Sequence, residues 1–403
     1  MSDPVLRILL TAGFVLALGR GVFLALTVLY FTLIVGLSPV EVAVVLTVSS
    51  GAGALATVGA GALADRLSAR RLIVVFEFVA GVALISYTLA DRFIVVLVIA
   101  CVYAASSQAS HSVRSAIIAR AFDGAGRVNA RAVLHTAVNV GIALGSAAAA
   151  GALLANTAPA FRITMVTAGV VILASVIPLL RLPVSVNAPA AAPTEDGRRA
   201  LGGRSPWRDR RYLVLTILVC IFNLQFGLFE IGMPLWILHS TEAPLSMVSV
   251  VLIVNTVIVI AFQIRLTRGT DDVRYAGRVV AIAGMLMAGA CAVYASTGFV
   301  SVWFAVALLV AASLAHSFAE VLGAAGNWGL SFELADQQRA GAYQGVFGLS
   351  WPFSAMLAPL VITAAVTNGL LGWAALGALF LLATFGVWWI ARRASAEPGS
   401  ALP

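Results

Sequence analysis

The sequence predicts an all-α polytopic membrane protein with twelve transmembrane helices in two groups of six, and three observations support this prediction. Of its 403 residues, 61% are hydrophobic and 10% are charged, with a mean hydropathy of +1.01, whereas a soluble domain carries about 25% charged residues. A helix needs roughly 20 mostly apolar residues to cross a bilayer, and runs of that length recur along the chain. One polar segment separates six of these runs from the other six.

The first apolar run is expected to be a permanent span. It is too long for the apolar part of a cleaved signal peptide and shows no clear cleavage site. The twelve expected spans are residues 5–34, 39–64, 71–90, 93–120, 130–157, 160–181, 211–240, 245–267, 276–297, 299–332, 340–367 and 370–391.

The segment between the sixth and seventh spans divides the chain. Residues 182–210 are rich in Pro, Ala, Gly and charged residues, so they cannot bury a core and are expected to form a flexible cytoplasmic linker. We therefore expect an N-terminal six-helix bundle over residues 1–181, a C-terminal six-helix bundle over 211–393 and a cytoplasmic tail over 394–403.

The arginines predict the orientation in the membrane. Alternate loops and the tail are basic, through Arg66, Arg70, Arg71, Arg120, Arg127, Arg131, Arg265, Arg268, Arg274, Arg278, Arg392 and Arg393. The opposite loops contain only Arg92 and Arg162. Because cytoplasmic loops carry an excess of basic residues, both termini are expected to be cytoplasmic. All 25 basic residues are arginine, which favours a bacterial plasma (inner) membrane, and the net charge of +8 needs no nucleic-acid partner.

A charged cluster between the second and third spans carries a family resemblance. The stretch GALADRLSARRL, residues 61–72, resembles the loop 2–3 signature of the major facilitator superfamily. Gly61, Leu63, Asp65, Arg66 and Arg70 match that signature, whereas Ser68 and Ala69 depart from it. The resemblance implies two pseudo-symmetric six-helix bundles around a central cavity, and transport by alternating access.

A weak internal repeat agrees with this resemblance. FDGAGRVNARA, residues 122–132, opens the fifth span, and LADQQRAGAYQ, residues 334–344, opens the eleventh. Each places Asp a few residues before Arg, as expected for parallel repeats in a transporter.

The cluster is expected to act as a conformational latch. Gly61 has no side chain, so another helix, expected to be span 11, can approach it closely. Asp65 is then expected at the exposed N–H groups at the start of that helix, where a negative charge is stabilised. The family pattern implies that Arg70 reaches Asp123. The alternative is that the arginines only fix the topology. The expected latch residues are Gly61, Asp65, Arg66, Arg70 and Asp123.

Polar residues inside the spans mark the expected transport path, because a charge in the bilayer is costly and is a functional candidate by default. The resemblance implies that spans 1, 4, 7 and 10 line the cavity. The cavity and substrate candidates on these spans are Arg20, Gln108, His111, Arg114, Asn223, Gln225 and Asn327.

Two carboxylates in these spans are candidates for proton coupling. A carboxylate in an apolar cavity binds a proton more readily than one in water, which makes Glu230 and Glu320 possible proton carriers. His316 lies four residues before Glu320 and so shares its helix face. The alternative is that each glutamate is permanently neutralised by Arg20 or Arg114.

The roles of the two buried arginines stay open at this level. Arg20 needs a partner, which is either Glu230 or Glu320 as a counter-ion or an anionic substrate. Arg114 either binds an anionic group of a substrate or holds a glutamate; with Gln108 and His111 it lies roughly along one face of span 4. Glu77, in peripheral span 3, is expected to pair with an arginine of the cluster at 66–71.

No nucleotide-binding loop or metal-ligand pattern is present in the sequence, so transport would use an ion or substrate gradient, with no cofactor and no metal. The stretch NVGIALGSAAAAGALL keeps Gly141 and Gly145 of the span 5 pattern of drug–proton antiporters, but Ser146 replaces its proline. We therefore expect proton-coupled efflux of small amphipathic compounds by a monomer. The alternatives are import of a small metabolite, either neutral or anionic, or a membrane sensor or intramembrane enzyme.

Overall fold

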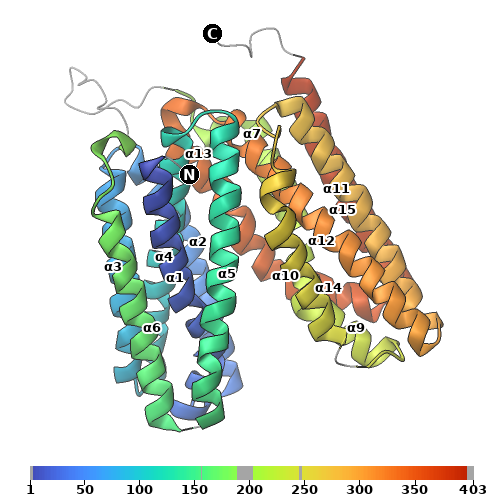
Figure 1. Cartoon of the computed structure of the whole chain (residues 1–403), viewed down its shortest axis with the longest axis horizontal. Helices are drawn as coiled ribbons and strands as arrows, with labels where there is room; N and C mark the ends of the chain where they lie inside the picture. Colours follow the sequence, from blue (N-terminus) through green and yellow to red (C-terminus); the bar gives the residue numbers. More distant parts are fainter. Residues whose placement is uncertain (1–2, 156, 188–202, 245–246, 397–403) are drawn as a thin grey trace. The chain divides into compact units, whose positions relative to one another are not determined.

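The expected all-helical fold is confirmed. The computed structural model describes residues 3–155, 157–187, 203–244 and 247–396, and every regular element in that part of the chain is a helix (Figure 1). Eleven of the described helical segments are long and apolar enough to cross a membrane by length and composition, and a shorter apolar helix covers Val250–Leu266. Together they correspond to the twelve spans expected from hydropathy.

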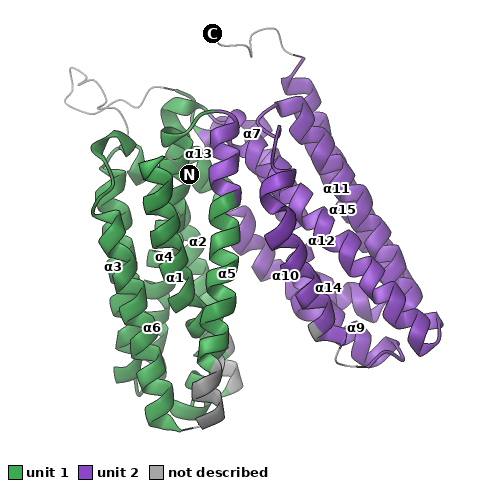
Figure 2. Ribbon diagram, viewed as in Figure 1, with its two compact units in different colours: residues 1–123, 133–205, 336–348 green, residues 124–132, 206–335, 349–403 purple. Residues whose placement is uncertain are grey.

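The chain folds into two compact units, which are coloured separately in Figure 2. Unit 1 comprises residues 1–123, 133–205 and 336–348, and unit 2 comprises residues 124–132, 206–335 and 349–403. The domain boundaries expected at residues 181 and 211 stay predictions. Residues 188–202 of the expected linker and 397–403 of the expected tail lie outside the described residues.

Unit 1 contains the first six long helices and one short helix from later in the chain. They are α1 (Pro4–Leu29), continued by a π-helical turn (Tyr30–Ile34), α2 (Pro39–Ala64), α3 (Ala69–Ser86), α4 (Phe93–Ala121), α5 (Ala125–Ala155), α6 (Ala158–Leu179) and α13 (Ala340–Gly348). The start of α5, up to residue 132, belongs to unit 2. Short 3₁₀ turns lie at Tyr87–Leu89, Val184–Val186 and Gln337–Arg339.

Unit 2 contains the remaining helices. They are α7 (Arg210–Asn223), α8 (Gln225–Gly227), a π-helical turn (Leu228–Gly232), α9 (Met233–Ser240), α10 (Met247–Leu266), α11 (Val273–Ser296), α12 (Val302–Glu333), α14 (Ser350–Thr367) and α15 (Gly369–Ala394). Two 3₁₀ turns lie at Pro206–Arg208 and Thr297–Phe299.

Side-chain caps define where the first two helices begin. Asp3 Oδ1 accepts hydrogen bonds from the backbone N–H groups of Val5 (2.7 Å) and Leu6 (3.1 Å) at the start of α1. Ser38 and Glu41 form a capping box before α2, in which each side chain bonds to the backbone N–H of the other residue. These bonds satisfy N–H groups that have no partner within the helix.

The seventh expected span is interrupted, which hydropathy alone does not predict. It consists of α7, α8, the π-helical turn at Leu228–Gly232 and α9. Pro234 has no N–H to donate to the carbonyl of Glu230, four residues earlier, and its ring crowds that carbonyl. A π-helical turn at this point relieves the conflict, and such turns are frequent at functional sites.

The eleventh expected span is also interrupted, between α13 and α14. Pro352 lies in the first turn of α14 and cannot donate to the carbonyl of Gly348, where α13 ends. The two pieces belong to different units, α13 to unit 1 and α14 to unit 2.

Each unit has its own apolar core. In unit 2, the Trp373 ring lies 5.5 Å from the ring of Trp236 and 5.6 Å from that of Tyr294, measured between centroids. The Trp236 indole N–H donates to the Tyr294 carbonyl and to the Thr297 hydroxyl, both at 2.9 Å. Aromatic pairs of this kind contribute about 0.5–1.5 kcal/mol beyond the area they bury, so this cluster fixes α9 against α11 and α15.

In unit 1, two glycines of span 5 allow close packing on α1. A Cβ atom at Gly141 would lie 2.9 Å from the Phe14 carbonyl oxygen, and one at Gly145 would collide with the carbonyl of Leu18. The Ser146 hydroxyl donates to the Gly21 carbonyl at 3.0 Å. Small residues at such spacing let membrane helices approach closely.

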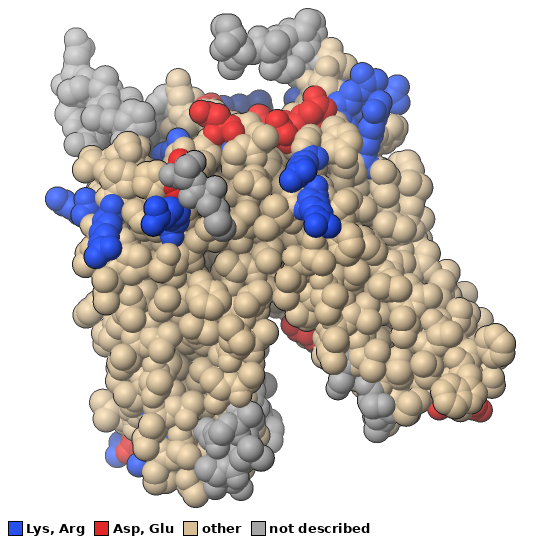
Figure 3. Space-filling view, viewed as in Figure 1, with Lys and Arg blue, Asp and Glu red and all other residues tan. Residues whose placement is uncertain are grey.

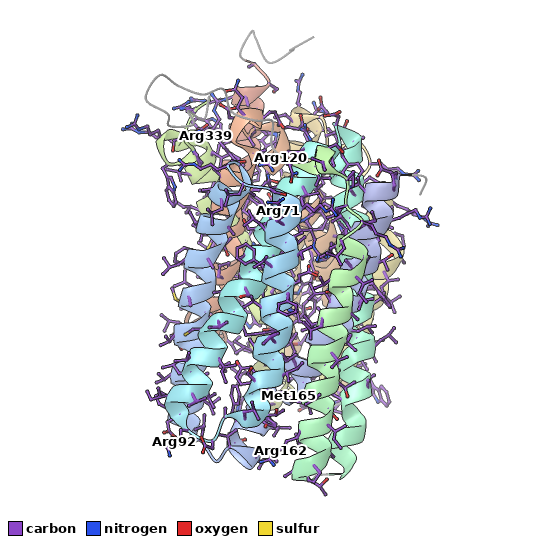
Figure 4. All side chains as sticks on the ribbon, turned by 90° about the vertical axis from the view of Figure 1, so that its left-hand side faces the viewer. Arg71, Arg92, Arg120, Arg162, Met165 and Arg339 are labelled. Carbon is purple, nitrogen blue, oxygen red and sulfur yellow. The ribbon has the colours of Figure 1, made fainter. Side chains whose placement is uncertain are left out.

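Arginines at or near the helix ends of unit 1 lie at the two opposite ends of the unit. Figure 4 shows Arg71, Arg120 and Arg339 near one end of the unit and Arg92 and Arg162 near the other. This is the separation that the alternating basic loops predict. Which end faces the cytoplasm stays a prediction.

Candidate functional site

The charged cluster of unit 1 centres on Asp65, the C-cap residue directly after α2. Its Oδ1 accepts a hydrogen bond from the Gly341 N–H at 2.8 Å, and its Oδ2 accepts one from the Ala342 N–H at 2.7 Å. Both donors lie in the first turn of α13, where the helix dipole favours a negative charge. Arg120 at the end of α4 forms an ion pair with the same carboxylate.

The Asp65 side chain is removed from water although it ends a helix. The residue is 4% exposed, and burial raises the pKa of Asp65, while Arg120 and the two backbone N–H groups of α13 oppose that rise. The charge of this carboxylate therefore depends on its donors being in place.

Gly61 allows α2 and α13 to meet. A Cβ atom at this position would lie 2.9 Å from the Gly345 Cα and 3.1 Å from the Ser112 hydroxyl, and it would collide with the Gly341 carbonyl. The close approach expected between this glycine and span 11 is therefore present within unit 1. Any larger residue would push α13 away from the Asp65 carboxylate.

Arg70 of the cluster has another partner than expected. The Arg70 guanidinium donates to the carbonyl of Leu180, rather than pairing with Asp123. The Arg70 backbone N–H and the Ser68 hydroxyl donate to the Asn187 side-chain oxygen, at 3.2 and 3.0 Å. Arg66 and Asp123 are exposed at the same end of unit 1.

The sequence reading missed Arg120 as the cation of the cluster. From the sequence, Arg120 counts only among the basic residues that set the topology, whereas it lies in the last turn of α4, which packs on α2. The signal that could have identified it is its place at the end of a span, next to the loop that holds Asp123.

A second buried ion pair lies inside unit 1 and involves Glu77. Glu77 is completely buried in α3 and pairs with Arg114 of α4. The hydroxyls of Ser110 and Ser175 also donate to this carboxylate, at 2.9 and 2.7 Å. The expected pairing of Glu77 with an arginine of the 66–71 cluster is wrong.

This pair assigns Arg114 one of its two expected roles, that of holding a glutamate. Arg114 is 6% exposed, and Gly13 of α1 leaves room for its guanidinium, since a Cβ atom there would lie 2.6 Å from Nη1. The three polar residues of span 4 therefore do not act along one face. Gln108 is half-buried beside Gly53 of α2, whereas His111 is exposed.

Arg20 of α1 is half-buried. Within the described residues of unit 1, no carboxylate lies within ion-pair distance of its guanidinium. The pairing with Glu230 or Glu320 would join the two units and stays a prediction.

In unit 2, Glu320 is 5% exposed on α12. The side-chain amide of Asn255 on α10 donates to its Oε2 at 2.7 Å and lies 3.4 Å from the Ser317 hydroxyl. Asn255 was not singled out in the sequence. It is an amide in the middle of a membrane span, and that position is the signal that could have identified it.

His316, one turn before Glu320, is completely buried. Its ring stacks on Phe229 at 3.9 Å between centroids, and the Tyr294 ring meets it edge-on at 6.2 Å. Neither ring nitrogen has a hydrogen-bond partner among the residues that the structure describes.

Glu230 occupies the π-helical turn of the seventh span and is exposed on the surface of unit 2. No hydrogen bond or ion pair holds its carboxylate among the residues that the structure describes. It therefore differs from Glu320, which is buried and has an amide partner.

The other polar candidates of unit 2 are buried or half-buried. The Asn223 side-chain amide lies 3.4 Å from the Ser350 hydroxyl. Gln225 and Asn327 are 2% and 3% exposed, and the side-chain oxygen of each lacks a hydrogen-bond partner in the described part of the chain. Buried polar atoms are seldom left without a partner, so these two oxygens and the His316 ring favour a hydrated or ligand-binding interior.

Comparison with known proteins decides the family. The sequence model described as the Major Facilitator Superfamily matches residues 9–359. The chain belongs to the Major Facilitator Superfamily. It is thus a multi-pass membrane protein and a secondary transporter of a small-molecule substrate.

Solved transporters share the fold of this Major Facilitator Superfamily member. The crystal structure of a bacterial homologue of the iron transporter ferroportin in an outward-facing state is 13% identical with a TM-score of 0.73, covering 98% of this chain and 100% of that chain. The human organic anion transporter TETRAN is 16% identical with a TM-score of 0.69, and the match covers 95% of this chain and 99% of that chain.

The E. coli fucose:proton symporter is 11% identical with a TM-score of 0.69, and covers 97% of this chain and 98% of its own. At these identities the likeness shows the fold alone. No curated protein sequence matches this chain.

Proposed function

We propose that this transporter exports small amphipathic compounds in exchange for protons, with Glu320 or Glu230 as the proton carrier. The observation that carries the proposal is the setting of Glu320. It is a buried carboxylate in a membrane-spanning helix, and its hydrogen-bond partner is a neutral amide rather than a cation. A carboxylate in such a setting can gain and lose a proton, whereas one fixed in an ion pair keeps its charge.

Glu77 shows the contrasting arrangement within the same chain. It is equally buried but paired with Arg114 and held by two serine hydroxyls. We assign Glu77 a structural role and reserve the coupling role for the two glutamates of unit 2. Substrates for a largely apolar binding site would be amphipathic rather than heavily hydroxylated.

The second part of the proposal concerns alternating access. The bonds from Asp65 to the first turn of α13 would hold α13 against α2 in one state of the transport cycle and would break in the other. Charge-assisted hydrogen bonds contribute about 1.5–3 kcal/mol each, enough to bias a two-state equilibrium without freezing it.

A second candidate function is import of a small anionic metabolite. The observation that favours it is Arg20, a half-buried cation of α1 without a carboxylate partner among the described residues of unit 1. Arg114 does not support this alternative because its guanidinium is paired with Glu77.

Purified protein in proteoliposomes tests the coupling. We expect Glu320→Gln or Glu230→Gln to abolish substrate accumulation driven by a pH gradient, while exchange of substrate down its own gradient continues, because an amide cannot release a proton. Glu242→Gln serves as the control, since Glu242 is exposed in a loop of unit 2, and it should behave as the wild type.

Full gradient-driven transport by both variants would rule out the two glutamates as proton carriers. Matched anionic and neutral compounds, assayed with wild type and Arg20→Ala, separate the second candidate function from the first. If Arg20→Ala selectively loses transport of the anionic compounds, that result would favour import of an anion.

A further inference from the structure

A basic and aromatic patch lies at one end of unit 2, where α11 begins and α15 ends. We define the patch by Arg274 and Arg278 of α11 and by Trp388, Trp389, Arg392 and Arg393 of α15. Figure 3 shows basic side chains gathered over this end of the two helices. The opposite ends of the same helices, residues 293–299 and 369–375, contain no charged residue.

The packing of the two helices brings the patch together. A Cβ atom at Gly277 would lie 2.5 Å from the Ala391 Cβ and 3.6 Å from the Trp388 Cα. The missing side chain therefore lets the start of α11 lie directly against the end of α15. Because the helices run in opposite directions, their basic turns are at the same level.

Helix geometry places the arginines on one side of this helix pair. Arg274 and Arg278 are four residues apart, so they share a face of α11. Viewed along the axis of α11, these two arginines are rotated by about 60–100° from Gly277, the position that contacts α15. On α15, Arg392 lies one turn after Trp388. Viewed along the helix axis, it is rotated away from the contact with α11, toward the side of the helix pair on which Arg274 and Arg278 lie. Three guanidinium groups therefore converge beside the seam between the helices.

The four arginines of the patch are exposed. Among the described residues, no carboxylate lies within ion-pair distance of Arg274, Arg278, Arg392 or Arg393. The nearby Asp272 caps α11 by accepting a hydrogen bond from the Tyr275 N–H at 2.6 Å. Like charges gathered this closely repel one another, so an anion bound among them would be stabilised.

The tryptophans fit the boundary between lipid tails and headgroups. The Arg393 guanidinium carbon lies 3.5 Å from the centre of the Trp389 ring, and that of Arg392 lies 5.5 Å from the centre of the Trp388 ring. Trp389 is 49% exposed. Tryptophan is enriched at membrane interfaces, and stacking on its ring orients an arginine for bidentate contact with a phosphate.

We propose that this patch binds the phosphate of an anionic phospholipid. Both helices are long and apolar enough to cross a membrane, so their charged ends lie at the depth of the headgroups. Basic pockets between membrane helices bind acidic lipid headgroups, and each arginine near the surface strengthens the attraction. The seam over Gly277 would take the phosphate, and the indole rings would contact the upper part of the acyl chains.

Native mass spectrometry of the purified transporter, titrated with phosphatidylglycerol or phosphatidylcholine, measures this binding. We expect the wild type to retain phosphatidylglycerol in preference to phosphatidylcholine. Arg278→Gln/Arg392→Gln should weaken phosphatidylglycerol binding by about 30-fold. Arg7→Gln/Arg92→Gln removes the same charge from exposed sites of unit 1 and should leave binding close to that of the wild type.

Equal weakening by both double variants, or equal retention of the two lipids, would overturn the proposal. Excess inorganic phosphate should not displace the lipid; displacement by phosphate alone would assign the patch to a soluble anion instead. The melting temperature of each variant is measured alongside. Because the patch is separate from the proposed coupling residues, the export proposal can fail without affecting this one.

Discussion

Asp65→Asn is expected to slow transport by about 30-fold while the protein still inserts and folds. The asparagine oxygen can accept a hydrogen bond from only one of the two α13 N–H groups. Its NH2 group is itself a donor, so it cannot bond to the other N–H or to the Arg120 guanidinium. The loss of about 2 kcal/mol of charge-assisted hydrogen bonding makes the state with α13 held against α2 about 30-fold less populated. Initial rates of uptake into proteoliposomes measure the effect.

A reporter at the contact makes the conformational effect visible. Ser112 is completely buried between Gly61 and Gly345, so Ser112→Cys, in a background without Cys101, Cys220 and Cys291, reports on the separation of α13 from α2. Maleimide labelling should rise when Asp65→Asn is added. Asp91→Asn, an exposed aspartate at the other end of unit 1, is the control. Unchanged labelling together with normal transport would leave the cluster only its role in topology.

Arg114→Leu is expected to be the most destabilising single substitution considered, lowering the free energy of unfolding by about 3–5 kcal/mol. It leaves the completely buried Glu77 carboxylate with two serine hydroxyls and no cation. For a unit of this size the apparent melting temperature should fall by about 10 °C. Thermal unfolding of the detergent-solubilised protein measures this change.

The double variant Glu77→Gln/Arg114→Leu separates the ion pair from simple loss of packing. A glutamine keeps hydrogen bonds to Ser110 and Ser175 without a buried charge, so most of the lost stability should return. Failure to recover would mean that Arg114 acts through its bulk rather than its charge. Normal transport of anionic compounds by the double variant would confirm that Arg114 does not bind substrate, and its loss would contradict the structural role.

Most of the fold could be predicted because hydropathy and loop charge act locally. A long run of apolar residues in a bilayer forms a helix because its backbone N–H and C=O groups must bond to one another, so the spans follow from composition. The interruptions of spans 7 and 11 depend on single prolines, Pro234 and Pro352. Counting apolar residues ignores these positions, although the missing N–H of proline is visible in the sequence.

The candidate site was predictable where chemistry requires a particular residue type and not where it depends on helix rotation. Gly61 and Asp65 meet the start of span 11 because only a glycine and a short acid fit there. Glu77 was assigned a partner close in sequence, whereas its partner lies on another helix. Residues three apart drift by about 60° for each step, so Gln108 and Arg114 face different neighbours despite their regular spacing.

The π-helical turn at Leu228–Gly232 implies that the number of residues in the seventh span is constrained, and not only its apolar composition. The wider turn accommodates one extra residue, whereas deleting a residue of α9 between this turn and Trp236 would rotate Trp236 by about 100° about the helix axis and shift it by about 1.5 Å. Trp236 would then turn away from Tyr294 and Thr297, the two residues that accept its indole N–H. Related sequences should therefore rarely carry insertions or deletions between this turn and Trp236.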